Sequence, residues 1–582
     1  MGAAFPREIS WIPEASVPCS TLAAPLPWGC YPEPMIRPLR SLLALGLFGL
    51  LASNSQAGAG DGRDELPLSA RERAVHLLSR LAHGPRPGEV ERMLELDEQA
   101  WLEQQLDPRP GGPTELVERL VGLSTLELDP SAMFDFVDVE LPEDASREER
   151  RKRDRRRAIP LRELVASIHL RQVEADDQLE EVLCSFWRNH LNVSFTKGYP
   201  AHLYLSSYEA RVVRDHALGS FPDMLRASAH HPAMMHYLDN HLSRRPPSGE
   251  ELAKVATRVR NEGGSKERAD EAVRIAAMRG LNENYARELL ELHTLGVDRG
   301  YTQKDVVAVA EAFTGWGLQS GARGVYGFQY DPQRHMEGNR RVLGFVVRED
   351  REREGLGEGE RVLDVLVRHN LTSEFIAEKL VRHLVADEPP EGLVEEVART
   401  YRKEDGDIRA MVRTIVASEE FWDRRHYQAK FKTPNEFLIS AIRATGAEVS
   451  DPWALQAPLA AMGQPTYHCD DPTGYHDHAE AWLDPGVLAK RWEVALQLAG
   501  GKLKGVAIPE EFYGDLGPEG SPLRWMQGMI AKLLPGGADT RTLAMLHEVV
   551  REHMGTRKRP DLSVLGPEVV GLLLGSPEFQ RQ

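Results

Sequence analysis

The segment Asn282–Gly296 carries the side-chain types that acid–base chemistry requires. If it is helical, the spacing i, i+3, i+4, i+7 places four polar side chains on one face. These are Asn284, Arg287, Glu288 and Glu291. Carboxylates can transfer protons, and guanidinium and amide groups can hold an anion or a polyol, so this stripe is our candidate for catalysis. The alternative is a solvated face with a Glu283–Arg287 ion pair worth roughly 0.2–0.5 kcal/mol.

Other polar residues would complete a cleft with this stripe if the helical segments pack together. His190 is a further candidate for catalysis, and the candidate binding residues are Asp239, Asn240, Asn282 and Trp316. The same side chains could instead form a buried polar network that fixes the packing of helices. His293 falls on the opposite, apolar side, where we expect a core histidine.

A loop rich in histidine and aspartate, Tyr467–His478, contains residue types that bind metals. The candidate ligands for a divalent metal are His468, Asp471, His476 and His478. An ordinary polar loop is the alternative. Once a leader is removed, only Cys184 and Cys469 remain, and they could form a disulfide in an oxidising compartment or stay free thiols.

The sequence contains no nucleophile elbow, phosphate loop or dinucleotide-binding fingerprint, so no standard enzyme class is indicated. The net charge of −18 argues against a nucleic-acid partner, because such proteins need a positive surface to neutralise phosphates.

The N-terminal residues predict export. Residues 1–34 have scattered prolines and no periodicity, and we interpret them as an extension that is untranslated or non-structural. Residues 35–57 have a basic start, a short apolar run and a small-residue exit, which is typical of a signal peptide cleaved near Ala57. The run is short for a membrane span, although an uncleaved anchor is the alternative. We therefore expect a periplasmic or extracellular protein with no stable membrane span after cleavage.

After a linker at residues 58–68, the pattern is helical to the end. We predict a mainly α fold: one large multi-helix domain at 69–582 with at most a few short strands, the latter within 325–344. Capping residues at Ser69, Thr302 and Asp407 mark helix starts, and Thr433-Pro434 opens a further helix with a first-turn proline. A charged segment at about 241–280 is predicted to be an insertion.

Several motifs, in order, resemble those of the bacterial domain-of-unknown-function 1800 family, over roughly residues 70–580. The motifs are Phe186–His190, His231–Asn240, Asn282–Gly296, Ala312–Trp316, Phe375–Leu380, Asp405–Arg409, Lys432–Phe437, Met462–Pro465 and Ser576–Phe579. The long link between Asn240 and Asn282 departs from the family pattern, as does Met336 in place of an acid. The resemblance implies an exported protein encoded beside a partner that resembles sulfatases and alkaline phosphatases, and it implies no reaction.

Two hypotheses follow. The first is an exported cell-envelope binding or assembly protein that works with a partner. The second is an exported hydrolase or transferase that uses the polar stripe on a polar or anionic substrate, with a divalent metal as an optional cofactor.

Overall fold

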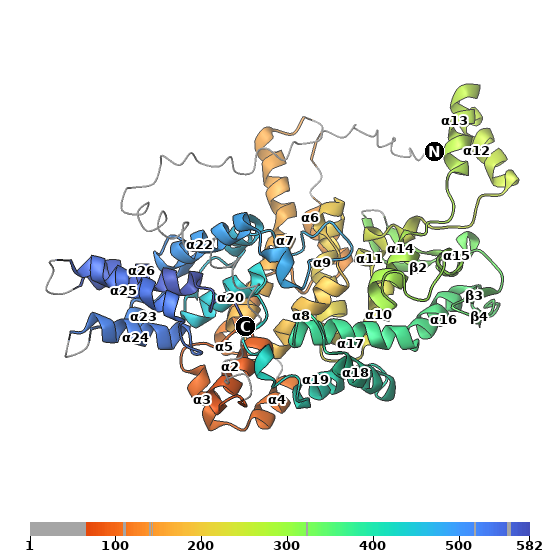
Figure 1. Ribbon diagram of the computed structural model, residues 1–582. Coiled ribbons are helices and arrows are strands. Elements are labelled where there is room, and N and C mark those ends of the chain that lie inside the picture. The colour runs from red at the N-terminus through yellow and green to blue at the C-terminus, as the bar shows by residue number, and fades with distance from the viewer. Residues whose placement is uncertain are drawn as a thin grey trace. The chain divides into compact units, whose positions relative to one another are not determined.

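The computed structural model describes residues 66–108, 112–138, 141–142, 144–321, 324–516, 520–555 and 560–582 (Figure 1). Within them helices dominate and strands are few and short, so the predicted mainly α fold is confirmed. Residues Gly62–Gln582 form one compact unit. The predicted extension, the signal peptide and most of the linker lie outside the described residues.

In the part of the chain that the structure describes, five helices precede the first long one. They are α2 (Ala70–Arg80), α3 (Glu89–Glu95), α4 (Glu98–Leu106), α5 (Thr114–Val121) and α6 (Pro130–Val137). The predicted capping box is present at the start of α2, where Ser69 and Glu72 satisfy each other's backbone N–H groups. Leu77, Leu78 and Leu81 are fully buried, so α2 is fixed to the core by its apolar side.

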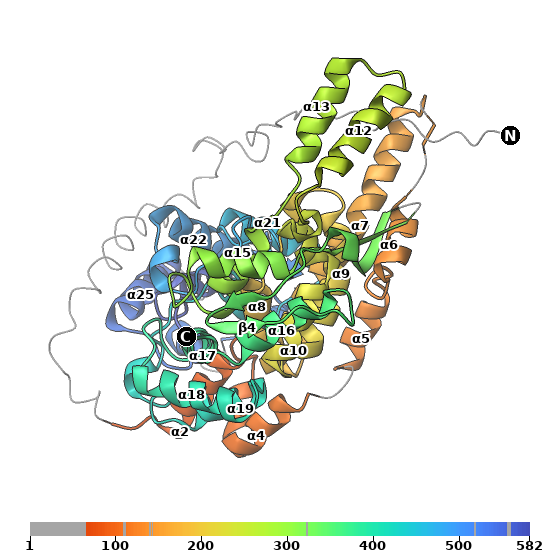
Figure 2. The same ribbon diagram turned by 90° about the vertical axis from the view of Figure 1, so that its right-hand side faces the viewer.

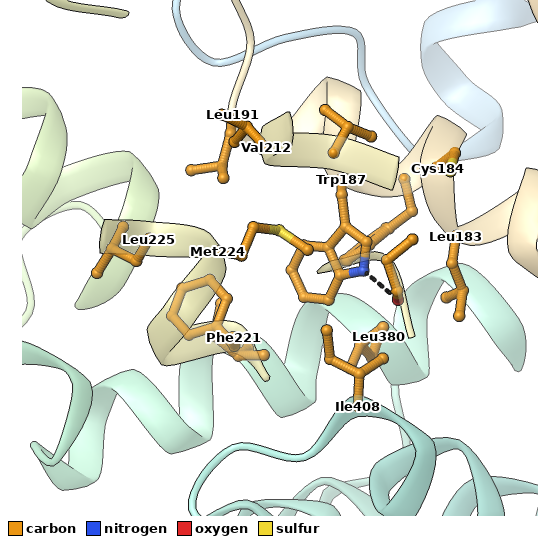
Figure 3. Close-up of a cluster of buried hydrophobic side chains, with 14 of the residues drawn as sticks. Leu183, Cys184, Trp187, Leu191, Val212, Phe221, Met224, Leu225, Leu380 and Ile408 are labelled. Atoms are coloured by element: carbon orange, nitrogen blue, oxygen red, sulfur yellow. Dashed lines mark hydrogen bonds between the residues drawn. The ribbon is translucent and has the colours of Figure 1, made fainter. Parts of the chain in front are cut away.

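Helix α7 (Arg147–Glu174) begins in the arginine-rich run and ends in the core. Its first turns are solvent-exposed, whereas Leu164, Val165 and Ile168 are buried. Helix α8 (Gln178–His190) follows, and most of its side chains are buried. Figure 3 shows its Trp187 surrounded by apolar side chains, and the indole Nε1 donates a 3.1 Å hydrogen bond to the Ala217 carbonyl.

The next segment is built from short helical pieces. They are α9 (Ala201–Tyr208), the π-helix η4 (Glu209–Val213), α10 (Phe221–His230), α11 (Pro232–Tyr237), α14 (Asn284–Glu288), the π-helix η7 (Leu289–Thr294) and α15 (Gln303–Ala312). The α-helix predicted to run through Asn282–Gly296 is therefore wrong in its second half. There the Leu295 N–H donates to the Leu290 carbonyl, five residues back. Gly296, at φ +95°, ends the helix as predicted.

The charged segment predicted near 241–280 folds as a helical hairpin. Its helices are α12 (Gly249–Asn261) and α13 (Lys266–Ala277), and Ala269 is the one residue of the two helices that is buried. Figures 1 and 2 both show the hairpin projecting away from its neighbours. At its base, the Arg244 N–H donates a 3.2 Å hydrogen bond to the Gly280 carbonyl, so the two ends of the insertion lie together.

The strands of the described residues form three antiparallel pairs. They are β1 (Trp316–Gly321) with β2 (Gly324–Tyr330), β3 (Arg340–Val342) with β4 (Phe345–Val347), and β5 (Glu448–Val449) with β6 (Val506–Ala507). The first two pairs fall in or beside the region predicted to hold strands.

Helices occupy most of the rest of the chain. They are α16 (Leu356–Val367), α17 (Asn370–Leu384), α18 (Glu391–Lys403), α19 (Ile408–Ala417), α20 (Pro434–Ala444), α21 (Gln456–Ala461), α22 (Pro485–Ala499), α23 (Glu510–Tyr513), α24 (Pro522–Leu533), α25 (Thr540–Met554) and α26 (Leu562–Gly575). None of the helices in the described residues is long and apolar enough to cross a membrane.

Candidate functional site

A cavity of about 290 Å³ lies where α2, α8, α17 and α20 meet the loop at 464–478. We call it the α8–α17 cavity. Its wall is rich in polar side chains from segments far apart in the sequence. They include Arg80, Gln172, Asn189, Lys379, Arg382, His383, Asn435, Glu436, Gln464, His476, Asp477 and His478.

Helix α8 separates the cavity from the core. Trp187 and Leu183 point into the apolar cluster of Figure 3. Phe186, Asn189 and His190 line the cavity instead. The amphipathic period of the helix therefore gives one apolar face to the core and one mixed face to the cavity.

Helix α17 contributes three basic side chains at spacing i, i+3, i+4, which places them together on one face. Arg382 is paired with Glu378 at 2.9 Å. Lys379 has no hydrogen bond or ion pair within the described residues, and its ammonium lies 5.3 Å from the centre of the Phe375 ring. Burial lowers the pKa of Lys379 to about 8. Lys379 is thus a half-buried cation with no directly paired carboxylate, and the charges of Asp477 and Glu378 only partly offset the effect of burial on its pKa.

Arg80, the last residue of α2, is a second cation without an ion pair in the described structure. It is 3% exposed, and its Nη2 donates to the His426 carbonyl at 2.8 Å, while Nε and Nη1 have no partner. Burial lowers the pKa of Arg80 to about 10. The guanidinium remains charged at neutral pH and adds positive potential to the cavity wall.

The third cavity-lining residue of α17, His383, forms a dyad with a carboxylate. Its Nδ1 lies 2.7 Å from Oδ2 of Asp477. The other carboxylate oxygen accepts a 3.1 Å hydrogen bond from Lys430, whose ammonium also bonds Asp387 at 2.9 Å. Burial would raise the pKa of Asp477, but Lys430 and His383 outweigh it and hold this pKa far below its usual range. Asp477 is therefore an anion and can only accept.

Of the residues predicted from sequence for catalysis, His190 alone lines the α8–α17 cavity. Its Nε2 lies 3.2 Å from the His293 carbonyl, and its Nδ1 has no partner. Burial holds the pKa of His190 well below its usual value and lowers that of His293 to about 3. Both rings are neutral, and His293 is the core residue that the sequence predicted.

The polar stripe of the Asn282–Gly296 segment lies elsewhere and does not line this cavity with His190. Arg287 bridges Glu283 at 3.2 Å and Glu291 at 3.4 Å, and Asn284 is exposed. The pKa of Glu288 is raised by burial and by the charges of Glu291 and Asp471. The stripe thus resembles the alternative given by the sequence, a solvated helix face with a Glu283–Arg287 ion pair.

The predicted binding residues lie beside this stripe or in the core. Asn284 Nδ2 donates to the Leu238 carbonyl at 3.3 Å, which places Asp239 and Asn240 next to the stripe as expected. Asp239 pairs with Lys197 at 2.8 Å, and Asn240 is buried.

Asn282 and Trp316 make contacts that stabilise the fold. Asn282 caps the start of α14 by accepting the Asn284 N–H at 2.9 Å. Trp316 is fully buried, with its ring centre 4.8 Å from that of Phe313.

The structure does not gather the predicted metal ligands. No group of three or more His, Cys, Asp or Glu side chains in the described residues could hold a metal ion. His468 packs on Phe195 at 4.6 Å, and Asp471 accepts from the Thr473 hydroxyl at 2.8 Å. His476 and His478 have ring centres 5.1 Å apart and both line the cavity. The four predicted ligands are therefore not brought together in the described structure, and a metal site in this loop stays a prediction.

Cys184 and Cys469 are both free thiols in this structure, with Cys184 buried and Cys469 half-buried. Burial raises the pKa of Cys184 well above its usual value, which makes this thiol inert as a nucleophile.

Sequence reasoning missed Arg80, Lys379 and the His383–Asp477 dyad as site residues. One signal existed, because Lys379 lies in the motif Phe375–Leu380 and shares a helix face with His383. Asp477 lies in the histidine- and aspartate-rich loop, but its partner His383 is 94 residues earlier in the sequence. Two carboxylates also line the cavity, but Asp477 is held by Lys430, and Glu436 accepts from the Thr433 N–H at 2.7 Å. The remaining cations, the fixed histidine and the amides suit the binding of an anion with hydrogen-bonding groups.

No curated protein and no solved structure matches the chain. One family model matches residues 76–581, nearly all of the compact unit, and its description is Protein of unknown function (DUF1800). The motifs found in order along the sequence and this match agree, and the chain belongs to that family.

Proposed function

We propose that this chain is an exported protein that binds a small anionic ligand in the α8–α17 cavity. The observation that carries the proposal is Lys379, whose ammonium lines the cavity and has no hydrogen bond or ion pair within the described residues.

Burying an ammonium without a partner costs free energy, which is why burial lowers its pKa. A charged side chain that destabilises the folded protein in this way is often found at a functional site. An anionic ligand would supply the missing counterion. Arg80 would strengthen the attraction, because it forms no ion pair among the described side chains and lines the same cavity.

The other wall residues support a small polar ligand. Asn189, Asn435 and Gln464 bring amide groups to the cavity, which can fix the orientation of oxygen atoms. A volume of about 290 Å³ is at the lower end for a small-molecule site.

Export is part of the proposal and is supported by the signal-like pattern of residues 35–57. The family resemblance supports a cell-envelope role beside a partner of the sulfatase- and phosphatase-like kind. Chemistry by the polar stripe has less support, because Arg287 and its two glutamates satisfy one another outside the cavity.

Calorimetric titration of the purified protein with inorganic phosphate and with citrate tests the binding. We expect Lys379→Met to weaken binding by roughly 10- to 100-fold, since a charge-assisted hydrogen bond is lost. The matched control is Lys490→Met, at an exposed lysine of α22 that pairs with Glu493. Because Lys379 has no partner to lose, its substitution should leave the melting temperature unchanged or raised. Unchanged affinity in Lys379→Met, or no binding of either anion, contradicts the proposal.

A further inference from the structure

We propose that the anion bound in the α8–α17 cavity is a phosphate group that still carries a proton, and that His383 selects it by accepting a hydrogen bond from the P–O–H group. This inference rests on the proposed function and names the class of ligand. It predicts that sulfate, which has the same shape but no proton near neutral pH, is rejected.

The first step is the state of the His383 ring. Asp477 is an anion that can only accept, so the Nδ1 atom 2.7 Å away must carry a proton and donate it. In neutral imidazole the other nitrogen, Nε2, then presents a lone pair. The carboxylate therefore fixes which tautomer faces the cavity.

The second step is the rigidity of this arrangement. Lys430 is 2% exposed at its side chain and bonds Asp477 and Asp387 together. Its ammonium also donates to the Arg382 carbonyl at 2.8 Å, which ties the network to the last turns of α17. The His383 ring packs on Phe186 with centres 5.1 Å apart. Asp477 cannot turn away from His383 without breaking these contacts.

The third step is that the acceptor is free. Nε2 of His383 has no hydrogen-bond partner in the part of the chain that the structure describes, and His383 lines the cavity. Lys379 is four residues earlier, one helical turn away on the same face. One ligand can thus contact the ammonium of Lys379 through an anionic oxygen and Nε2 through a hydroxyl.

The fourth step is the chemistry of the ligand. An anion whose oxygens all accept would face the Nε2 lone pair with a lone pair of its own, which leaves two polar atoms unsatisfied in an enclosed site. Sites built to hydrogen-bond a hydroxyl discriminate strongly against analogues that lack it. Hydrogen phosphate and monoprotonated phosphate monoesters provide both the negative charge and the donor.

The test compares tetrahedral anions that differ in the proton. Titrations at pH 7 with inorganic phosphate, methyl phosphate, sulfate and methyl sulfate should show each phosphate binding roughly 10- to 100-fold tighter than its sulfate analogue. Comparing methyl phosphate with inorganic phosphate shows whether the site prefers a phosphate ester or free phosphate. Equal affinity within both pairs overturns the inference.

Two variants locate the selectivity. In His383→Phe the ring contact with Phe186 is kept and the acceptor is lost, so the preference for phosphate should disappear. In Asp477→Asn the amide can accept or donate, the tautomer is no longer fixed, and sulfate should gain affinity. His547→Phe, at an exposed histidine of α25, is the control and should keep the full preference. Retained selectivity in His383→Phe overturns the inference.

Since Asp477→Asn also loosens a buried ion pair, nitrogen NMR of His383 in the wild-type protein gives a second measurement. A proton on Nδ1 and none on Nε2 is expected, and a proton on Nε2, in the opposite tautomer or in the doubly protonated ring, overturns the inference. If all four anions bind equally and Lys379→Met weakens them all, this inference fails and anion binding stands. If none binds, both fail.

Discussion

Charged side chains in the wall of the α8–α17 cavity are of two kinds: some form ion pairs with the protein, and others do not. Arg188 is held by Glu209 through two hydrogen bonds of 2.8 and 2.7 Å, and Glu209 also accepts from the Tyr467 hydroxyl at 2.6 Å. Burial would raise the pKa of Glu209, but Arg188 lowers it overall. Lys379 has no comparable partner. The first arrangement serves the stability of the wall, and the second leaves a charge available for a ligand.

At the residue scale, we predict that Arg188→Met lowers the free energy of unfolding by about 3–5 kcal/mol, because it leaves the Glu209 carboxylate buried with one ion-pair partner removed. Adding Glu209→Gln should recover part of this loss, since the uncompensated charge is then gone. Urea unfolding followed by circular dichroism measures both. Arg211→Met, at an exposed pair with Asp215, should change the value by less than about 0.5 kcal/mol. A cost for Arg188→Met no larger than for Arg211→Met would show that the pair contributes little.

At the scale of elements, helix α16 packs on Trp316 through a glycine. A Cβ atom at Gly359 would lie 2.6 Å from the indole ring of Trp316, far inside normal contact. Trp316 also packs edge-on against Phe328 with ring centres 5.1 Å apart, so it has little freedom to move. The close approach of α16 therefore depends on the absence of a side chain at Gly359.

We predict that Gly359→Ala destabilises the protein by about 1–3 kcal/mol through overpacking against Trp316. The matched control is Gly392→Ala in α18, where nothing lies within 4 Å of the added methyl group. There the stability should stay constant or rise by about 0.5–1 kcal/mol, because alanine favours the helix. Guanidinium unfolding measures the free energy of unfolding of both variants. Equal values would mean that α16 can shift to accommodate the methyl group.

The elements that sequence predicted correctly are those specified locally. Thr302 and Asp407 cap α15 and α19 as predicted, and Pro434 lies in the first turn of α20, because these signals involve residues at most three apart. The π-helix η7 was not predicted, although the burial of Leu289, Leu290 and His293 in it fits the apolar pattern of the sequence. A periodicity of 3.6 residues could not reveal this.

The candidate site was predicted less well for the same reason. His190 was identified by residue type within a motif. Arg80 reaches its carbonyl partner across 346 residues of sequence, and the dyad joins α17 to a loop 94 residues later. Contacts of this kind depend on tertiary packing, so the spacing of residues along the sequence does not predict them.

At the scale of the whole molecule, the compact unit does not use the α12–α13 hairpin to build its core. Besides the Arg244–Gly280 bond, the Asn282 N–H donates to the Ser243 hydroxyl at 3.1 Å, so the chain closes on itself below the hairpin. Arg245 lies at this closure, with its N–H donating to the Arg334 carbonyl at 2.8 Å. None of the residues that line the α8–α17 cavity belongs to the hairpin.

We therefore predict that replacing Gly249–Ala277 with a short Gly/Ser linker leaves a folded protein. The melting temperature should change by no more than about 1–2 °C, because roughly 1 kcal/mol shifts it by about 1 °C in a unit of this size. Phosphate affinity should be the same as in the parent. The contrasting variant removes α18 (Glu391–Lys403), whose Leu393, Val397 and Ala398 are fully buried, and it should not give a cooperative transition. Calorimetric melting and phosphate titration measure both properties. A broad transition or a lost binding heat in the linker variant would mean that the hydrogen bonds at its base do not hold the closed chain by themselves, and that the hairpin stabilises the compact unit.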